Sequence, residues 1–140
     1  MLVLDTNVVS EILKPRPAPE VIQWFEKVEA EKVCFTAIGE AELLYGTARL
    51  PAGQRRTSLE AAISRTTEEF FAERVLCFNR GCAPIYAHLR AESARRGVVM
   101  TPSDAMIAAI AALHNATLAT RNTKDFELAG VPLVNPWNPL

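Results

Sequence analysis

Hydrophobic and polar residues follow two repeating patterns along the chain. Short apolar runs are typical of buried strands, and longer stretches with apolar residues three or four positions apart are typical of helices. We expect strands at 2–4, 33–36, 75–78, 117–120 and 131–134. We expect helices at 8–13, 20–30, 37–49, 55–71, 82–96 and 104–114, and a turn into a short helix at 121–126.

The order of these elements predicts the fold. Strands and helices alternate throughout, which is typical of a parallel sheet with helices on both faces, a three-layer α/β/α sandwich. Pro132 lies in the last strand and has no amide hydrogen to donate, so this strand is expected at the edge of the sheet. A chain of 140 residues has the size of one ordinary domain, so we predict a single domain over 1–140.

Composition narrows the setting in which the protein works. The apolar fraction of 49% and the charged fraction of 22% are those of a soluble globular protein. No apolar run reaches the roughly 18 residues of a membrane span, and no basic and apolar leader precedes the first strand. The three cysteines are odd in number and form no close CxxC pair, which favours reduced thiols. We therefore expect a cytoplasmic protein without membrane association.

The charge of the chain limits how it could bind a nucleic acid. With a net charge of −1, it will not coat a polyanion non-specifically, so binding would need local basic patches. The candidates are adjacent or nearby basic residues, namely Arg55 with Arg56, Arg95 with Arg96, and Arg121 with Lys124. For any single pair, a solvated helix end or loop is the favoured interpretation. Arg121 is the basic residue that we assign to substrate binding.

Acidic and amide side chains recur where the predicted strands end. Asp5 follows the first strand, and Glu42 lies on the helix after the second. Asp104 opens the helix before the fourth strand, and Asn122 and Asp125 follow that strand. Because the carboxyl ends of parallel strands share one edge of the sheet, we expect these residues to meet there.

Such a cluster favours a metal site. Neighbouring carboxylates repel each other unless a cation lies between them, and hard oxygen ligands suit Mg²⁺ or Mn²⁺. We predict Asp5 and Asp104 as metal ligands, with Glu42 bound through water or orienting the attacking water. Thr6 and Asn7 would hydrogen-bond the ligand carboxylates or the substrate phosphate. Hydrolysis of a phosphodiester by metal-activated water is the natural reaction of such a site.

Each of these acids also has a purely structural interpretation. Asp5 would N-cap the following helix, and Asp104 would be the third residue of a capping box after Thr101. Glu42, close to Glu40, would be a solvated acid on a helix face. A phosphoryl-transfer domain such as a receiver or phosphatase is disfavoured, because no second aspartate lies two residues after Asp5 and no lysine is suitably placed.

Five stretches, taken together in their order and spacing, resemble one known family. They are Leu4-Asp5-Thr6-Asn7-Val8, Ala41-Glu42-Leu43-Leu44-Tyr45-Gly46, Ser103-Asp104-Ala105-Met106-Ile107-Ala108-Ala109, Ala119-Thr120-Arg121-Asn122-Thr123-Lys124-Asp125-Phe126 and Val134-Asn135-Pro136-Trp137. The chain resembles PIN-domain proteins over essentially its whole length. Within that family it is most similar to the VapC ribonuclease toxins of type II toxin–antitoxin modules, in their FitB-like branch.

The resemblance implies a Mg²⁺- or Mn²⁺-dependent endoribonuclease that hydrolyses RNA. It places metal ligands at Asp5 and Asp104 and a third catalytic acid at Glu42. A fourth acid is often found where this chain has Asn122, and Asp125 follows three residues later. The site would therefore bind metal more weakly than a four-acid site or use Asp125 instead.

The resemblance also implies partners. A cognate antitoxin would cover the site and supply DNA binding, so that DNA is met only indirectly, and the toxin would form a homodimer. The alternative function is a catalytically weak or inactive partner of a DNA-binding antitoxin that acts in repressor assembly. The missing acid at Asn122 and the near-neutral net charge both permit that alternative.

Overall fold

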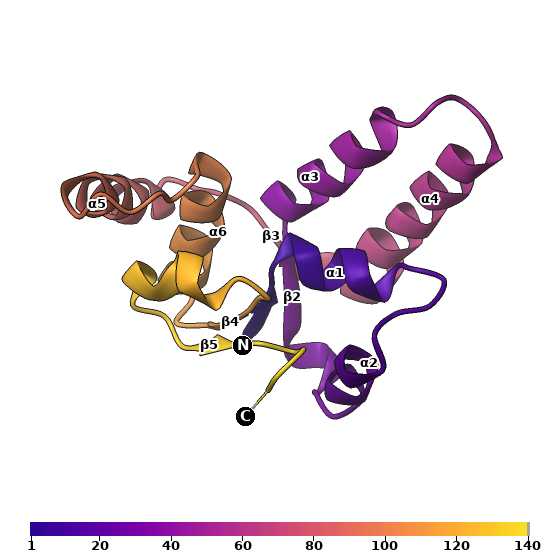
Figure 1. Ribbon diagram of the computed structural model, residues 1–140, viewed down its shortest axis with the longest axis horizontal. Helices are drawn as coiled ribbons and strands as arrows, with labels where there is room; N and C mark the ends of the chain where they lie inside the picture. Colours follow the sequence, from indigo (N-terminus) through magenta and orange to yellow (C-terminus); the bar gives the residue numbers. More distant parts are fainter. Residues whose placement is uncertain (140) are drawn as a thin grey trace.

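A five-stranded parallel sheet runs through the computed structural model, in the order β3-β2-β1-β4-β5 (Figure 1). Residues 1–139 are described, and Leu140, the last residue of the predicted domain, lies outside them. The strands are β1 (Leu2–Leu4), β2 (Val33–Thr36), β3 (Val75–Leu76), β4 (Thr117–Ala119) and β5 (Leu133–Val134). In register, Val3 on β1 is aligned with Cys34 on β2 and with Leu118 on β4. The parallel sheet and the edge position of the last strand confirm the sequence prediction.

Helices connect the strands. The α-helices are α1 (Thr6–Ile12), α2 (Pro19–Glu26), α3 (Ala37–Ala48), α4 (Gln54–Arg65), α5 (Cys82–Arg95) and α6 (Pro102–Leu113). Shorter helical segments are η1 (Ala30–Lys32), η2 (Thr66–Phe71), η3 (Ala72–Arg74) and η4 (Thr123–Ala129). Among residues 1–139, no helix is long and apolar enough to cross a membrane.

Both faces of the sheet are covered, as the alternation of side chains along a strand requires. Val3 and Leu118 belong to a buried cluster with residues of α5 and α6, such as Leu89 and Ile107. Leu4, the next residue along β1, belongs to a second cluster with Phe35 and with residues of α1 and α2. Figure 1 shows α5 and α6 on one side of the strands and α1, α3 and α4 on the other. This is the predicted three-layer sandwich.

Several predicted boundaries were wrong by a few residues. The first helix begins at Thr6 rather than at residue 8, because Asp5 already caps it. The second ends at Glu26 rather than at residue 30, and η1 then turns the chain into β2. The strands at both edges of the sheet are two residues long rather than four.

The helix predicted over 55–71 is the largest difference. Regular α-helix ends at Arg65 and the chain continues as a wider π-helical segment, η2. Aromatic packing accounts for this change, since a wider turn alters the direction of the side chains that follow. Phe71 stacks on Phe35 with ring centroids 5.3 Å apart, and Phe70 packs edge-on against Phe71 at 4.9 Å. Phe70 also lies 5.6 Å from Phe25 on the neighbouring helix.

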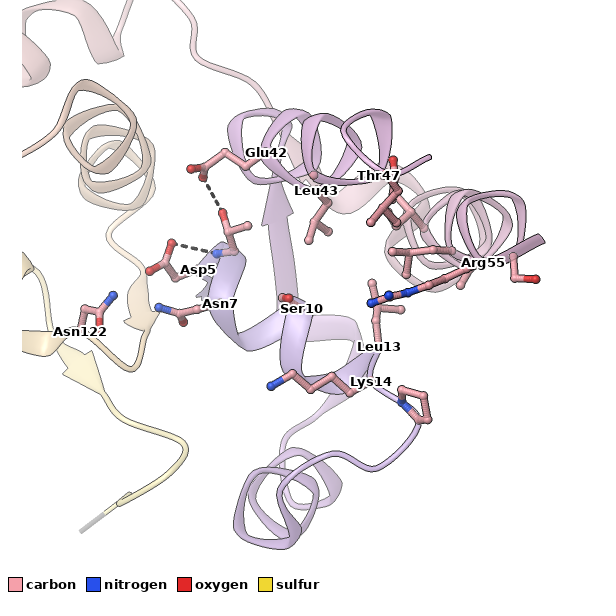
Figure 2. Close-up of a pocket in the computed structure, with 18 of the residues that line it drawn as sticks. Asp5, Asn7, Ser10, Leu13, Lys14, Glu42, Leu43, Thr47, Arg55 and Asn122 are labelled. Carbon is pink, nitrogen blue, oxygen red and sulfur yellow. Dashed lines mark hydrogen bonds between the residues drawn. The ribbon is translucent and has the colours of Figure 1, made fainter. Parts of the chain in front are cut away.

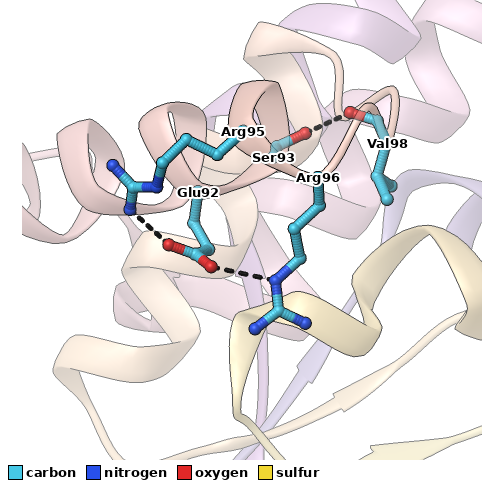
Figure 3. Close-up of polar contacts among 5 residues, drawn as sticks. All are labelled: Glu92, Ser93, Arg95, Arg96 and Val98. Atoms are coloured by element: carbon cyan, nitrogen blue, oxygen red, sulfur yellow. Dashed lines mark hydrogen bonds and ion pairs between the residues drawn. The ribbon is translucent and has the colours of Figure 1, made fainter.

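The C-terminal end of α5 carries a self-contained ionic cluster (Figure 3). Glu92 accepts hydrogen bonds from the guanidinium groups of Arg95 and Arg96, the latter at 2.9 Å. These bonds, with Arg95 contributing most, lower the pKa of Glu92 to about 2. Gly97 follows with φ of +66°, the left-handed conformation in which a glycine ends a helix without strain. The basic pair Arg95–Arg96 is therefore occupied within its own helix.

Candidate active site

Asp5 lies at the carboxyl end of β1 and is almost fully buried. One oxygen, Oδ1, accepts the backbone amide of Thr6 at 2.8 Å, which makes Asp5 the N-cap of α1. The other, Oδ2, accepts the hydroxyl of Thr120 at 2.8 Å. The structural role considered from the sequence is thus present. Since each carboxylate oxygen can accept two hydrogen bonds, it leaves room for a further ligand.

Thr120 is a residue of the site that the sequence alone did not single out. It is fully buried just after β4, and its hydroxyl accepts the backbone amide of Asn122 at 3.1 Å. The same hydroxyl donates its hydrogen to Asp5, and this hydrogen bond stabilises the ionised carboxylate. The available signal was a hydroxyl at the end of the strand that pairs directly with β1.

Glu42 reaches Asp5 through Thr6. The Thr6 hydroxyl donates to Glu42 Oε1 at 2.7 Å, which ties α3 to the start of α1 (Figure 2). Gly39 allows this close approach, because an added Cβ would lie only 2.4 Å from a ring carbon of Phe35 and 3.2 Å from the Thr6 hydroxyl. A side chain at Gly39 would therefore disturb both the core and the Glu42 contact.

Asp104 lies in the first turn of α6. Its amide donates to the Thr101 hydroxyl at 3.1 Å, so Thr101 is the N-cap and Pro102 the first residue, as predicted. Partial burial raises the pKa of Asp104, and the negative charges of Asp125 and Glu42 raise it further, against a lowering by Thr101. The structure thus brings Asp104 into the electrostatic field of the other acids.

The pKa of Asp5 records the same crowding. It is raised from 3.8 to about 6, mainly by burial and further by the charges of Asp104 and Glu42. The hydrogen bonds from Thr120 and Thr6 act in the opposite direction. The negative charge of Glu42 thus raises the pKa of both Asp5 and Asp104, and a cation bound between these acids would stabilise the site.

The other predicted residues fall into two groups. Asn122 lines the same cavity (Figure 2), and the side chain of Asn7 accepts the backbone amide of Arg121 at 3.3 Å. The Arg121 guanidinium lies over the ring of Trp137, 4.8 Å from its centroid, and does not line the cavity. Asp125 is also outside the lining and acts on Asp104 through its charge.

These side chains surround one end of a long groove, with a volume of about 1030 Å³, that continues between α1, α3 and α4. Six of the eight predicted site residues line it, namely Asp5, Thr6, Asn7, Glu42, Asp104 and Asn122. Lys14 and Arg55 also line it. No pattern in the sequence singled out Lys14, and Arg55 stood out only as a member of one of the three basic pairs.

The donor set fits a hard divalent cation. Among the described residues, no three His, Cys, Asp or Glu side chains are close enough together to hold a metal ion by themselves. Mg²⁺ does not require such a cage, because it is usually held by one or two carboxylates and keeps several waters or substrate oxygens. Asp5 and Asp104 would supply that pair, and Glu42 and Asn122 also line this groove.

Comparisons with known proteins identify the family of this chain. The family profile of the PIN domain matches residues 2–131. "VapC ribonuclease Y4jK" from Sinorhizobium fredii is 40% identical over 139 residues, covering 99% of each chain. The solved structure of FitAB bound to an IR36 DNA fragment matches with a TM-score of 0.91 and 38% identity, covering 99% of this chain and 96% of that one.

A more distant solved structure has the same fold over the same length. It is a toxin–antitoxin complex from Klebsiella pneumoniae, with a TM-score of 0.73, 26% identity and coverage of 99% of both chains. The family match covers four of the five strands and the strand-end acids, namely Asp5, Glu42 and Asp104. The chain belongs to the PIN domain family.

Proposed function

We propose that this protein is a metal-dependent endoribonuclease and the toxic component of a type II toxin–antitoxin system. The observation that carries the proposal is the buried Asp5, whose pKa is raised to about 6 beside the charges of Asp104 and Glu42 at the end of an open groove. Repulsion between these carboxylates destabilises the fold, so their arrangement points to a cationic ligand. The name of the Sinorhizobium fredii relative supports RNA as the substrate.

In this proposal Asp5 and Asp104 hold Mg²⁺, or Mn²⁺ in its place. When bound, such an ion supplies positive charge to a phosphoryl oxygen and lowers the pKa of water. Glu42, fixed by its hydrogen bond from Thr6, orients the attacking water. The water oxygen forms a bond to phosphorus and releases a proton to solvent, while the bond from phosphorus to the leaving sugar oxygen breaks and that oxygen takes up a proton.

The remaining residues position these groups. Thr120 keeps Asp5 ionised and aligned, a role of the kind that supports metal ligands elsewhere. Asn122 adds no charge, and its amide is available to bind water or a substrate phosphate. The negative charge of Asp125 raises the pKa of Asp104. The hydrogen bond from the Arg121 amide to Asn7 Oδ1 ties the segment after β4 to the start of α1.

Partners follow from the same proposal. A cognate antitoxin binds the protein and carries its contact with DNA, which is supported by the solved FitAB–DNA and Klebsiella pneumoniae toxin–antitoxin structures. A homodimer is supported by α3, which leaves Leu44 and Tyr45 exposed to solvent. The free cysteines Cys34, Cys77 and Cys82 support a cytoplasmic location.

The test is cleavage of a pool of structured RNA by purified protein without antitoxin, in Mg²⁺, in Mn²⁺ and in a chelator. We expect cleavage only with metal, and a loss of at least about a hundredfold in folded Asp5→Asn and Asp104→Asn. Cleavage that survives chelation, or that both variants retain, would contradict the proposal. A wild-type protein inert with every metal and RNA would instead favour the non-catalytic partner of a DNA-binding antitoxin.

A further inference from the structure

The groove has a second charged end, which the reaction proposed above does not use. Lys14 follows the C-terminal end of α1, and Arg55 lies in the first turn of α4. They are the only lysine and arginine among the described residues that line the groove. Figure 2 shows Arg55 extending from α4 toward α1. The groove is therefore acidic where Asp5 and Asp104 lie and cationic at the other end.

Arg55 differs from its neighbour Arg56 in what it contacts. Arg56 pairs with Glu60 on the same helix, with Nε 2.8 Å from Oε1, and is not part of the groove. Arg55 makes no ion pair and no side-chain hydrogen bond within 1–139. Its guanidinium donors are thus free to bind an anion in the groove, for which a planar guanidinium is well suited.

Glu11 holds the Lys14 side chain in place through an ion pair. The Lys14 ammonium lies 2.9 Å from Oε1 of Glu11, a buried carboxylate whose other oxygen accepts the backbone amide of Ala18 at 2.9 Å. Lys14, and then the Ala18 amide, lower the pKa of Glu11, so this carboxylate stays ionised. Glu11 itself does not line the groove. An ammonium has three donors and Lys14 lines the groove, so two donors stay available to a ligand there.

The spacing between the two ends suits a nucleic-acid strand. Lys14 lies nine positions after Asp5, and nine helical steps of about 1.5 Å span roughly 13 Å. A single strand carries one phosphate per nucleotide, so a strand of several nucleotides can place one phosphate at the acids and others at the cations. The hydroxyls of Ser10 and Ser58 also line this stretch.

We propose that single-stranded RNA lies along this groove, and that Lys14 and Arg55 bind the phosphates that flank the scissile bond. They would be substrate-positioning residues, acting on the affinity and register of a long substrate rather than on the bond that breaks. The inference rests on the proposed ribonuclease function, because it takes the acidic end as the place of cleavage.

The experiment compares two substrates of different length. Lys14→Gln, Arg55→Gln and the double variant are assayed on a single-stranded RNA and on bis(p-nitrophenyl) phosphate, a diester too small to reach the cationic end. We expect the RNA kcat/KM to fall about tenfold in each single variant and about a hundredfold in the double variant, mostly through KM. Activity on the small diester should not change.

Matched controls separate position from total charge. Lys27→Gln and Arg56→Gln remove the same charges outside the groove and should leave RNA cleavage unchanged. Lys14→Arg keeps the charge and the partner of Glu11, so it should retain most of the RNA activity. If Lys14→Gln were merely destabilised, its activity on the small diester would fall as well. In direct binding of RNA to the Asp104→Asn protein, each removed cation should reduce the salt slope by about one.

Three results would overturn the inference. The double variant could cleave RNA with the wild-type kcat/KM, or its loss could be matched by the controls. Alternatively, RNA binding could be unchanged while binding of an acidic protein segment is lost, which would make the occupant a protein. A wild-type protein that cleaves neither substrate contradicts the ribonuclease function instead, and the binding assay then still decides whether Lys14 and Arg55 contact RNA.

Discussion

Two carboxylates, Asp5 and Glu92, are held in opposite electrostatic environments. Glu92 is flanked by Arg95 and Arg96, whose hydrogen bonds lower its pKa to about 2 (Figure 3). Asp5 also accepts two hydrogen bonds, but burial and the nearby charges of Asp104 and Glu42 raise its pKa to about 6. Both are polar clusters with short contacts. The ionic cluster on α5 is balanced by its own side chains, and the cluster at the strand ends is not.

This difference separates a structural cluster from a functional one. A carboxylate paired with two arginines has no need of a ligand, and as a surface pair it contributes little to folding. A buried carboxylate beside two other acids weakens the fold unless a cation binds. The presence or absence of a charged partner also distinguishes Arg56, which pairs with Glu60, from Arg55, which lines the groove.

The strongest way to disrupt the acidic cluster without touching an acid is Gly39→Ala. The new Cβ would meet the Phe35 ring and approach the Thr6 hydroxyl, so we expect a loss of about 1–3 kcal/mol of stability from overpacking. RNA cleavage should fall with it, because the contact between Thr6 and Glu42 moves. Urea unfolding and cleavage assays measure the two effects.

The matched control is Gly46→Ala in the same helix. An added Cβ at Gly46 has no neighbour within 4 Å, so alanine should stabilise the protein by about 0.5–1 kcal/mol through helix propensity. If both alanines stabilised the protein equally, Gly39 would not be needed for the approach of α3 to α1.

Thr120→Val should alter the pH dependence of the site. Removing the hydroxyl deletes a donor that stabilises ionised Asp5, so the pKa of Asp5 rises above about 6. The low-pH limb of RNA cleavage should move toward higher pH, with about a tenfold loss of activity at neutral pH. Thr120→Ser keeps the donor and should restore the wild-type profile. An unchanged profile in Thr120→Val would show that Asp5 does not titrate in the reaction.

The stability of the metal-free protein should respond to the two carboxylates in different pH ranges. The folded-state pKa of Asp5, about 6, lies above its ordinary value of 3.8, so ionised Asp5 destabilises the fold. Lowering the pH from 7 toward 5 should therefore raise the melting temperature. Glu92, with its pKa lowered from 4.5 to about 2, contributes stability that is lost only as the pH falls below about 4.5.

Two variants show which carboxylate causes each change of melting temperature with pH. Asp5→Asn should remove the rise between pH 7 and 5, and Glu92→Gln should weaken the fall below about 4.5. A melting temperature that stays flat from pH 7 to 5 in wild type would contradict the environment assigned to Asp5.

The smallest effect is expected for Glu92→Gln at neutral pH. Glu92, Arg95 and Arg96 do not line the groove. RNA cleavage should match wild type within error in steady-state assays. A large loss would mean that Arg95 and Arg96, once released, interact with the substrate or with the site.

Much of this arrangement could be predicted from the sequence. The apolar strand runs and the alternation with helices specify the parallel sandwich, and this topology brings Asp5, Glu42 and Asp104 to one edge. Local signals also identified the start of α6 at Thr101 and Pro102. These features depend on short-range patterns or on a general property of parallel sheets.

The rest depends on packing that no local pattern encodes. The shift to π-helix after Arg65 follows from aromatic contacts with residues more than thirty positions away. Gly39 matters only because α3 meets Phe35 and Thr6 there. The i,i+4 spacing of Arg56 and Glu60 is readable in the sequence, but the place of Arg55 in the groove is set by how α4 packs on α1 and α3. Thr120 likewise gains its role from a contact 115 residues away in the chain.

The most direct test of the central claim is a calorimetric titration of Mn²⁺, and then Mg²⁺, into wild-type protein, Asp5→Asn and Glu92→Gln. We expect wild type and Glu92→Gln to bind the ion alike, with proton release that grows as the pH is lowered toward about 6. Asp5→Asn should bind at least about tenfold more weakly. Equal binding by wild type and Asp5→Asn, or no binding by wild type, would contradict the claim that the strand-end acids form a cation site.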